Sequence, residues 1–122
     1  MTKELHALVV DDEWSIRSFT KDVLEDLGFI VTEAGHPQDA AARLKERGYH
    51  ILVTDNSMPS GKGTDFLREI TGQYPDMARL LVSAESDALL AATQMNIPSL
   101  EKPYNASQLI TAVEQAMSPL PK

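Results

Sequence analysis

The chain has 122 residues and no cysteine, and its 11 Lys and Arg against 18 Asp and Glu give a net charge of -7. A chain of this length forms one domain that buries about two-thirds of its unfolded surface, and the lack of cysteine excludes disulfides and cysteine-based zinc or thiol chemistry. An acidic surface repels a phosphate backbone, so we expect no direct binding to nucleic acid. The sequence contains neither a signal-peptide pattern nor an apolar run of membrane-spanning length, so we expect a cytoplasmic chain with no membrane partner.

Short apolar runs alternate with segments of helical period along the chain. The predicted strands are residues 5–10, 29–33, 50–54, 79–83 and, more weakly, 97–101. A helix follows each strand: the second is predicted from Pro37 to Gly48, and the fourth is short, from about Ser86 to Met95. The fifth opens with Asn105 and Gln108 in capping-box spacing. One face of the first helix carries the apolar residues Ile16, Phe19, Val23 and Leu27.

Strict alternation of strands and helices implies right-handed crossovers and a parallel sheet covered on both faces. We therefore predict an α/β fold with a doubly wound five-stranded parallel sheet. Its commonest form is the flavodoxin-like three-layer α/β/α arrangement with strand order 2-1-3-4-5. Pro98 supports this order, because proline is tolerated mainly in edge strands and the fifth strand lies at an edge. We expect one domain over residues 1–118, followed by a tail or the start of a linker at 119–122.

Polar residues stand at the carboxyl ends of the predicted strands, where ligands bind in such sheets. In strand order, these residues are Asp11 and Asp12, Asp55, Ser83 and Lys102. Taken singly, each has a structural explanation as a helix cap or a turn residue. Their convergence on the crevice between the first and third strands favours a functional site instead.

The residue types at this crevice indicate a specific chemistry. Three carboxylates, from Asp11, Asp12 and Asp55, suit Mg²⁺, a hard cation that takes oxygen ligands at about 2.0–2.1 Å. A carboxylate can also act as a nucleophile and form an acyl phosphate. Phosphoryl transfer needs charge neutralisation from a metal, an ammonium group and a hydroxyl or amide donor. Lys102 and Ser83 fit the last two roles, so these residues permit Mg²⁺-dependent phosphoryl transfer.

Four short segments form a combination that is more specific than any of them alone. They are the Asp11-Asp12 pair, Asp55 followed by "NSMPSGKG", the "VSA" that contains Ser83, and "KPY" at 102–104. With them the chain resembles, from residue 5 to residue 117, the receiver domain of bacterial two-component response regulators, as in chemotaxis-type receivers. The resemblance implies that the domain catalyses its own phosphorylation and dephosphorylation. It also implies a sensor histidine kinase or phosphotransfer protein as donor, and an output domain or downstream protein as partner.

The resemblance assigns roles to residues of this chain. Asp55 would accept the phosphoryl group from a phosphohistidine. Mg²⁺ would be bound directly by Asp12, largely through water by Asp11, and by Asp55 and the Ser57 backbone carbonyl. The remaining two roles fall on Ser83, which would turn to hydrogen-bond the phosphoryl group, and on Lys102, which would pair with it.

Two features depart from the receiver pattern. Receivers usually carry Tyr or Phe three residues before the lysine, where ring rotation reports phosphorylation, but this chain has Ser99. The segment from Ser83 to Lys102 is also about one helical turn shorter than the family pattern, with the loss in the fourth helix. We therefore expect intact chemistry at Asp55 and weaker coupling to the last strand.

Three alternatives stay open at this point. A dehalogenase-type Mg²⁺ phosphatase also uses an aspartyl nucleophile, but that nucleophile follows the first strand in an Asp-x-Asp motif. A flavodoxin-like flavin binder needs a hydroxyl-rich loop after the first strand, where this chain has carboxylates. The third alternative is a receiver-like module that binds partners without being phosphorylated.

Overall fold

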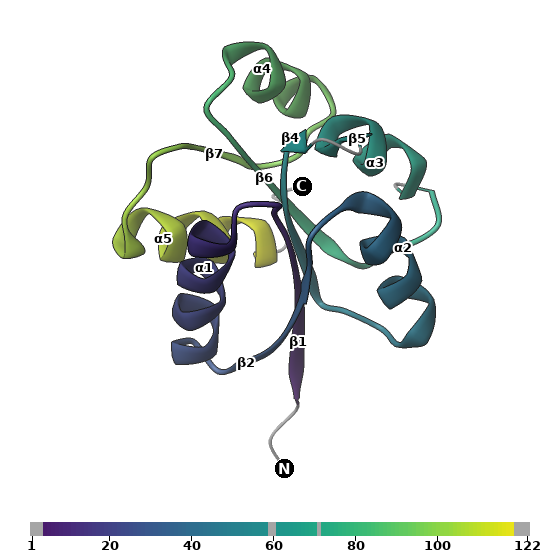
Figure 1. Cartoon of the computed structure of the whole chain (residues 1–122), viewed down its shortest axis with the longest axis vertical. Coiled ribbons are helices and arrows are strands. Elements are labelled where there is room, and N and C mark those ends of the chain that lie inside the picture. Colours follow the sequence, from purple (N-terminus) through teal and green to yellow (C-terminus); the bar gives the residue numbers. More distant parts are fainter. Residues whose placement is uncertain (1–3, 59–60, 71, 119–122) are drawn as a thin grey trace.

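A five-stranded parallel sheet forms the centre of the computed structural model, which describes residues 4–58, 61–70 and 72–118 (Figure 1). Its strands lie in the order β2-β1-β3-β6-β7. Their bounds are Leu5–Val10 for β1, Phe29–Ala34 for β2, Ile51–Asp55 for β3, Ala78–Ser83 for β6 and Ser99–Glu101 for β7. This is the predicted order 2-1-3-4-5, with β6 and β7 as the fourth and fifth strands of the sheet.

Helices cover both faces of the sheet and make three layers (Figure 1). The helices within the described residues are α1 (Trp14–Asp26), α2 (Pro37–Glu46), α3 (Gly63–Ile70), α4 (Ser86–Gln94) and α5 (Ala106–Met117). One core lies between the sheet and α2, α3 and α4, and it contains the buried Leu8, Leu52 and Leu81. The other lies between the sheet and α1 and α5, and it contains Val9 and Val53. Because successive side chains of a strand point to opposite faces, one apolar run serves both cores.

The helices lie in the segments that the sequence predicts, but some of their ends differ from the predicted ends. The capping box at Asn105 and Gln108 is formed, since each side chain accepts a hydrogen bond from the backbone N–H of the other. Helix α2 ends at Glu46, two residues before Gly48. A two-residue antiparallel pair, β4 (Ser57–Met58) with β5 (Gly61–Lys62), was not predicted. None of the described helices is both long and apolar enough to cross a membrane.

The face of α1 that packs on the sheet differs from the predicted face. Val23 is buried as expected, but Phe19 and Leu27 are 39% and 37% exposed. Thr20 and Leu24 are buried in their place. A threonine is tolerated there because its hydroxyl forms a hydrogen bond, so the burial costs little. The apolar face of α1 is therefore turned by one residue from the face that periodicity alone indicates.

Strand β7 forms one edge of the sheet, as Pro98 predicts. It has three residues, which pair with Leu81, Val82 and Ser83 of β6. Pro98 precedes the strand, and Pro103 follows it after Lys102. The edge is therefore short and has a proline close to each of its ends.

Candidate functional site

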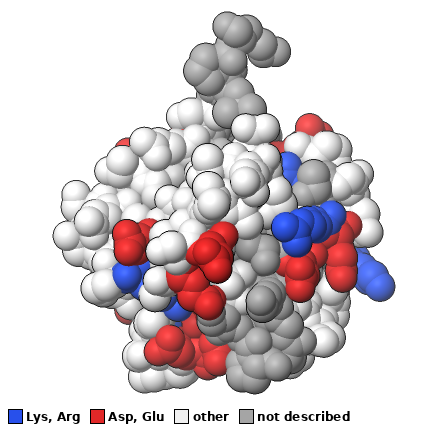
Figure 2. All heavy atoms as spheres, turned by 90° about the horizontal axis from the view of Figure 1, so that it is seen from above, with Lys and Arg blue, Asp and Glu red and all other residues white. Residues whose placement is uncertain are grey.

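The carboxyl ends of the parallel strands meet at one end of the molecule, and Figure 2 looks down on this end, where acidic side chains gather. Strand β1 leads into Asp11 and Asp12, and β3 ends at Asp55. One carboxylate oxygen from each of these three residues lies within 4.8 Å of those of the other two. The structure therefore brings together the three carboxylates predicted from the strand ends.

Asp11 is held at four of its atoms. Its backbone N–H donates to the Ala34 carbonyl at 3.1 Å, which continues the β1–β2 pairing past the end of the strand. Its Oδ1 accepts from the Glu13 N–H at 2.9 Å, and its Oδ2 lies 3.2 Å from Lys102 Nζ. Its carbonyl accepts from Arg17 at 2.7 Å. Asp11 therefore does bind the backbone at the start of α1, as the helix-cap explanation suggests, while its second oxygen faces the site.

Lys102 lies among the carboxylates. Its Nζ is 2.9 Å from Asp55 Oδ1, 3.2 Å from Asp11 Oδ2 and 3.9 Å from Glu13 Oε1. The side chains of Asp11 and Asp55 are each 3% exposed and that of Lys102 is 12% exposed, whereas Asp12 is exposed. Counting the described side chains alone, three carboxylates against one ammonium leave the centre of the site with excess negative charge.

The pKa values of the central pair reflect this crowding. Burial raises the pKa of Asp55; the hydrogen bond from Lys102 opposes this effect and the charge of Asp11 adds to it, so the net shift is upward. Burial alone would lower the pKa of Lys102, but its hydrogen bond to Asp55 and the charge of Asp11 outweigh burial and raise the pKa. Compared with the unfolded chain, folding thus makes Asp55 harder to ionise and makes Lys102 hold its proton more strongly.

Ser83 ends β6 next to this cluster and is buried. Its Oγ accepts a hydrogen bond from the Glu85 N–H at 2.9 Å, so it holds the turn into α4. Asn56, directly after Asp55, donates from Nδ2 to Glu85 Oε1 at 2.9 Å. The loop between β6 and α4 is therefore tied both to Ser83 and to the residue beside Asp55.

For some of the residues named in the sequence analysis, the structure tests the prediction only in part or not at all. Ser57 begins β4, two residues after Asp55 in the chain, and the assignment of its carbonyl stays a prediction. Pro59, within the matched segment after Asp55, and the tail at 119–122 lie outside the described residues. Ser99 is the first residue of β7 and is half-buried.

Two arrangements near the site were missed by sequence reasoning. Arg17 donates from Nη1 to the Asp11 carbonyl at 2.7 Å and from Nε to Glu33 Oε1 at 3.1 Å. Thr20 Oγ1 lies 2.8 Å from the hydroxyl of Tyr104, whose pKa is raised by burial. Sequence reasoning missed them because a single arginine or threonine in a helix looks the same in the sequence whether it contacts the site or lies on the surface.

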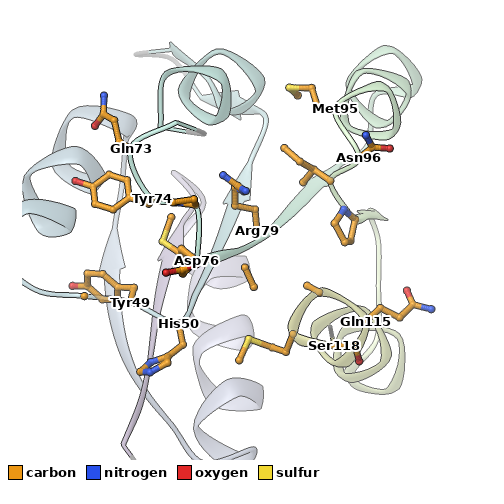
Figure 3. A pocket seen from close by; sticks show the side chains of 18 residues that line it. Tyr49, His50, Gln73, Tyr74, Asp76, Arg79, Met95, Asn96, Gln115 and Ser118 are labelled. Carbon is orange, nitrogen blue, oxygen red and sulfur yellow. The ribbon is translucent and has the colours of Figure 1, made fainter. Parts of the chain in front are cut away.

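Two pockets lie at different ends of the sheet. A cavity of about 400 Å³ opens beside the site and is lined by Ser15, Ile16, Phe19, Ala84, Tyr104 and the Lys102-Pro103 pair. A second pocket, of about 770 Å³, lies near the amino ends of β6 and β7, with Arg79 in the middle of the view in Figure 3. Among the described residues, none of those predicted for the site lines the second pocket.

Comparisons with known proteins agree with this geometry. The family model for the response regulator receiver domain matches residues 7–114. The chain is 31% identical over 115 residues to chemotaxis protein CheY-3 of Vibrio cholerae, covering 89% of this chain and 88% of that protein. A response regulator receiver domain from Clostridium thermocellum superposes with a TM-score of 0.83 at 30% identity, covering 93% of this chain and 94% of that chain. The beryllofluoride-activated NtrC4 receiver domain dimer gives a TM-score of 0.83 at 29% identity, with 92% and 95% covered. The chain therefore belongs to the family of response regulator receiver domains, which act in phosphorylation-based two-component signalling.

Proposed function

We propose that Asp55 accepts a phosphoryl group from the phosphohistidine of a sensor histidine kinase or phosphotransfer protein. The observation that carries this proposal is the position of Asp55, whose Oδ1 lies 2.9 Å from Lys102 Nζ within the three-carboxylate cluster. In the transfer, an Asp55 oxygen forms a bond to phosphorus as the phosphorus–nitrogen bond breaks, and the departing imidazole takes up a proton from solvent. The product is an acyl phosphate.

The same cluster fits Mg²⁺. It offers oxygen atoms only, from Asp11, Asp12 and Asp55, and this is the ligand type that Mg²⁺ prefers. The excess negative charge left after pairing with Lys102 also suits a divalent cation. We propose these three residues and the Ser57 carbonyl as the protein ligands, with Asp11 acting largely through water. Bound Mg²⁺ would neutralise charge on the oxygens of the transferring phosphoryl group.

Two further residues would act on the phosphoryl group. Lys102, whose raised pKa keeps it protonated, would pair with a phosphoryl oxygen and offset its charge. The Ser83 hydroxyl would exchange its hydrogen bond from the Glu85 N–H for one to the phosphoryl group. The acyl phosphate would thereby release the turn into α4 and change how the domain binds an output domain or a downstream protein.

The donor protein would approach over the start of α1. Trp14 is 70% exposed and Phe19 is 39% exposed on this helix, and Phe19 lines the 400 Å³ cavity that also contains Lys102. Exposed aromatic side chains next to a reactive site are typical of protein contact surfaces.

Because ATP-dependent histidine kinases supply the phosphoryl group, we propose that the chain acts in the cytoplasm.

Intact-mass measurement tests the acceptor. The protein is incubated with a small acyl phosphate, with and without Mg²⁺, and we expect the mass of one added phosphoryl group only in the presence of Mg²⁺. Asp55→Asn removes the nucleophile and should abolish the adduct. Asp65→Asn, at an exposed position in α3, is the matched control and should keep it.

Two outcomes contradict the proposal. An unchanged adduct in Asp55→Asn would place the acceptor elsewhere. No adduct in the wild-type protein, with small donors and with a phosphorylated histidine protein, would support the alternative of a receiver-like module that binds partners without phosphorylation.

A further inference from the structure

Arg17 contacts the site at the backbone carbonyl of Asp11 and not at the Asp11 carboxylate. Three of the four contacts of Asp11 are with the Ala34 carbonyl at the end of β2, the Glu13 N–H at the start of α1, and Lys102 after β7. The fourth partner, Arg17, lies one turn into α1 and donates to the Asp11 carbonyl at 2.7 Å. This is the shortest of the four contacts, and a guanidinium donor makes it charge-assisted.

The Arg17 side chain is itself fixed. Its Nε donates to Glu33 Oε1 at 3.1 Å, so the guanidinium bridges a carbonyl at the end of β1 and a carboxylate on β2. The Arg17 side chain is 19% exposed and that of Glu33 is 34% exposed. A planar group held by two partners in a partly buried place has little freedom, so it holds the Asp11 carbonyl in one direction.

The direction of the Asp11 carbonyl constrains the position of the next residue. A peptide bond is planar, so the Asp11 carbonyl lies in one plane with the N and Cα atoms of Asp12. Holding the carbonyl therefore limits the positions open to the Asp12 Cα, from which the exposed Asp12 side chain extends. The contact thus restrains the backbone that carries both acidic residues of the turn.

We propose that Arg17 is a positioning residue that holds the turn between β1 and α1, so that Asp11 and Asp12 present their carboxylates together to Mg²⁺. This inference rests on the proposed function. Arg17 acts through the backbone of Asp11 and does not touch the metal. When a residue that holds a metal ligand in place is lost, the affinity for the metal typically falls by about 10- to 100-fold.

Calorimetric titration with Mg²⁺ alone tests this role. Arg17→Met removes both hydrogen bonds with little change in side-chain length, and we expect the Mg²⁺ dissociation constant to rise by about 10-fold or more. Arg17→Lys keeps the charge but loses the planar fork, so it should show an intermediate loss. Glu33→Gln keeps an acceptor for Arg17 and should bind Mg²⁺ almost as wild type does. The matched control is Arg43→Met, because Arg43 of α2 also pairs with carboxylates, those of Asp39 and Glu46. This variant should leave Mg²⁺ binding unchanged.

A second measurement separates positioning from general destabilisation. If Arg17 only orients the turn, saturating Mg²⁺ should restore the rate of Asp55 phosphorylation in Arg17→Met to near the wild-type value, while the Mg²⁺ concentration for half-maximal rate stays raised. A lower maximal rate with an unchanged half-maximal concentration would overturn the inference. So would Mg²⁺ binding by Arg17→Met that equals wild type within the error of the titration.

The outcomes distinguish this inference from the proposed function. Absence of Mg²⁺ binding in the wild-type protein would refute the proposed metal site and this inference with it. Normal wild-type binding together with normal binding by Arg17→Met would refute the role of Arg17 alone. If Arg17→Met does not fold, Arg17→Lys decides: an affinity equal to wild type would overturn the inference, and a loss that saturating Mg²⁺ compensates would support it.

Discussion

Replacing Lys102 by methionine removes the ammonium group that lies between Asp11 and Asp55 and keeps the length of the side chain. The Nζ atom lies 2.9 Å from Asp55 Oδ1 and 3.2 Å from Asp11 Oδ2. At an effective dielectric constant of about 20, each contact contributes about 5–6 kcal/mol of Coulomb energy. Desolvation of the buried groups offsets a large part of this attraction, and removing one partner of such a buried pair costs about 3–5 kcal/mol. In Lys102→Met the two carboxylates would also repel each other without compensation.

We therefore expect Lys102→Met to lower the free energy of unfolding by about 3–5 kcal/mol at pH 7 in Mg²⁺-free buffer. Urea denaturation followed by circular dichroism measures this difference. Because the pKa of Lys102 is raised above 10.5 in the folded protein, the stabilisation by Lys102 is complete below pH 10.5 and is lost as the pH rises through the folded pKa. The gap between wild type and variant should therefore narrow at high pH.

Magnesium and a matched variant complete the experiment. Millimolar Mg²⁺ should stabilise Lys102→Met more than it stabilises wild type, because the cation replaces the missing positive charge. Lys21→Met removes a lysine that makes a 3.9 Å pair with Glu25 on the surface of α1, and it should change stability by less than about 0.5 kcal/mol. The reasoning is refuted if Lys102→Met loses no more stability than Lys21→Met, or if Mg²⁺ leaves the gap between variant and wild type unchanged.

Three further predictions concern other parts of the site. Asp55→Asn should raise the melting temperature of the Mg²⁺-free protein at pH 7, because burial and the charge of Asp11 oppose the ionisation of Asp55 more than Lys102 favours it. Unlike Lys102→Met, this variant leaves no buried charge without a partner, since Lys102 still pairs with Asp11. The gain should shrink as the pH falls through the folded pKa of Asp55 and vanish below 3.8, and equal melting temperatures at pH 7 would contradict it. Fluorescence of Trp14, at the start of α1 beside the acidic turn, should respond to Mg²⁺; a flat titration with binding established by calorimetry would mean that the indole points away from the site. In amide hydrogen exchange, a beryllofluoride mimic should change protection mainly in the loop after β6 and in α4, because Ser99 supplies no aromatic ring to carry the response to β7. Strong changes across β7 and α5 would show that Ser99 does not limit the coupling.

The fold could be predicted because its information lies in local patterns. Strands β1, β3 and β6 each contain a run of at least three aliphatic residues, and strict alternation of strands with helices leaves few topologies. The rotation of α1 could not be predicted in the same way. Periodicity favours Phe19 over Thr20 as a buried residue, but the hydroxyl of Tyr104, 84 positions away, makes burial of Thr20 acceptable. The β4–β5 pair has two residues in each strand, too few to show alternation.

The site could be predicted at the level of residues but not of orientation. The rule that parallel strands end together is enough to group Asp11, Asp55 and Lys102. It does not reveal that one oxygen of Asp11 is used by the Glu13 N–H, or that the Ser83 hydroxyl holds the turn into α4, because both depend on side-chain rotamers. The dehalogenase-type phosphatase and the flavin binder were open from the residues alone, and the family match decides against both.

The short edge strand β7 also affects how this domain can meet other chains. An exposed sheet edge presents unpaired backbone N–H and C=O groups to which a strand of another chain can hydrogen-bond. This pairing underlies many cases of aggregation and domain swapping. Here the edge has three residues, with Pro98 before it and Pro103 two positions after it, and proline has no N–H to donate to an added strand. A second chain could therefore form only a very short ladder. A protein that binds at this edge would therefore contact mainly side chains of β7 and its neighbouring helices, because the edge offers few backbone groups for pairing.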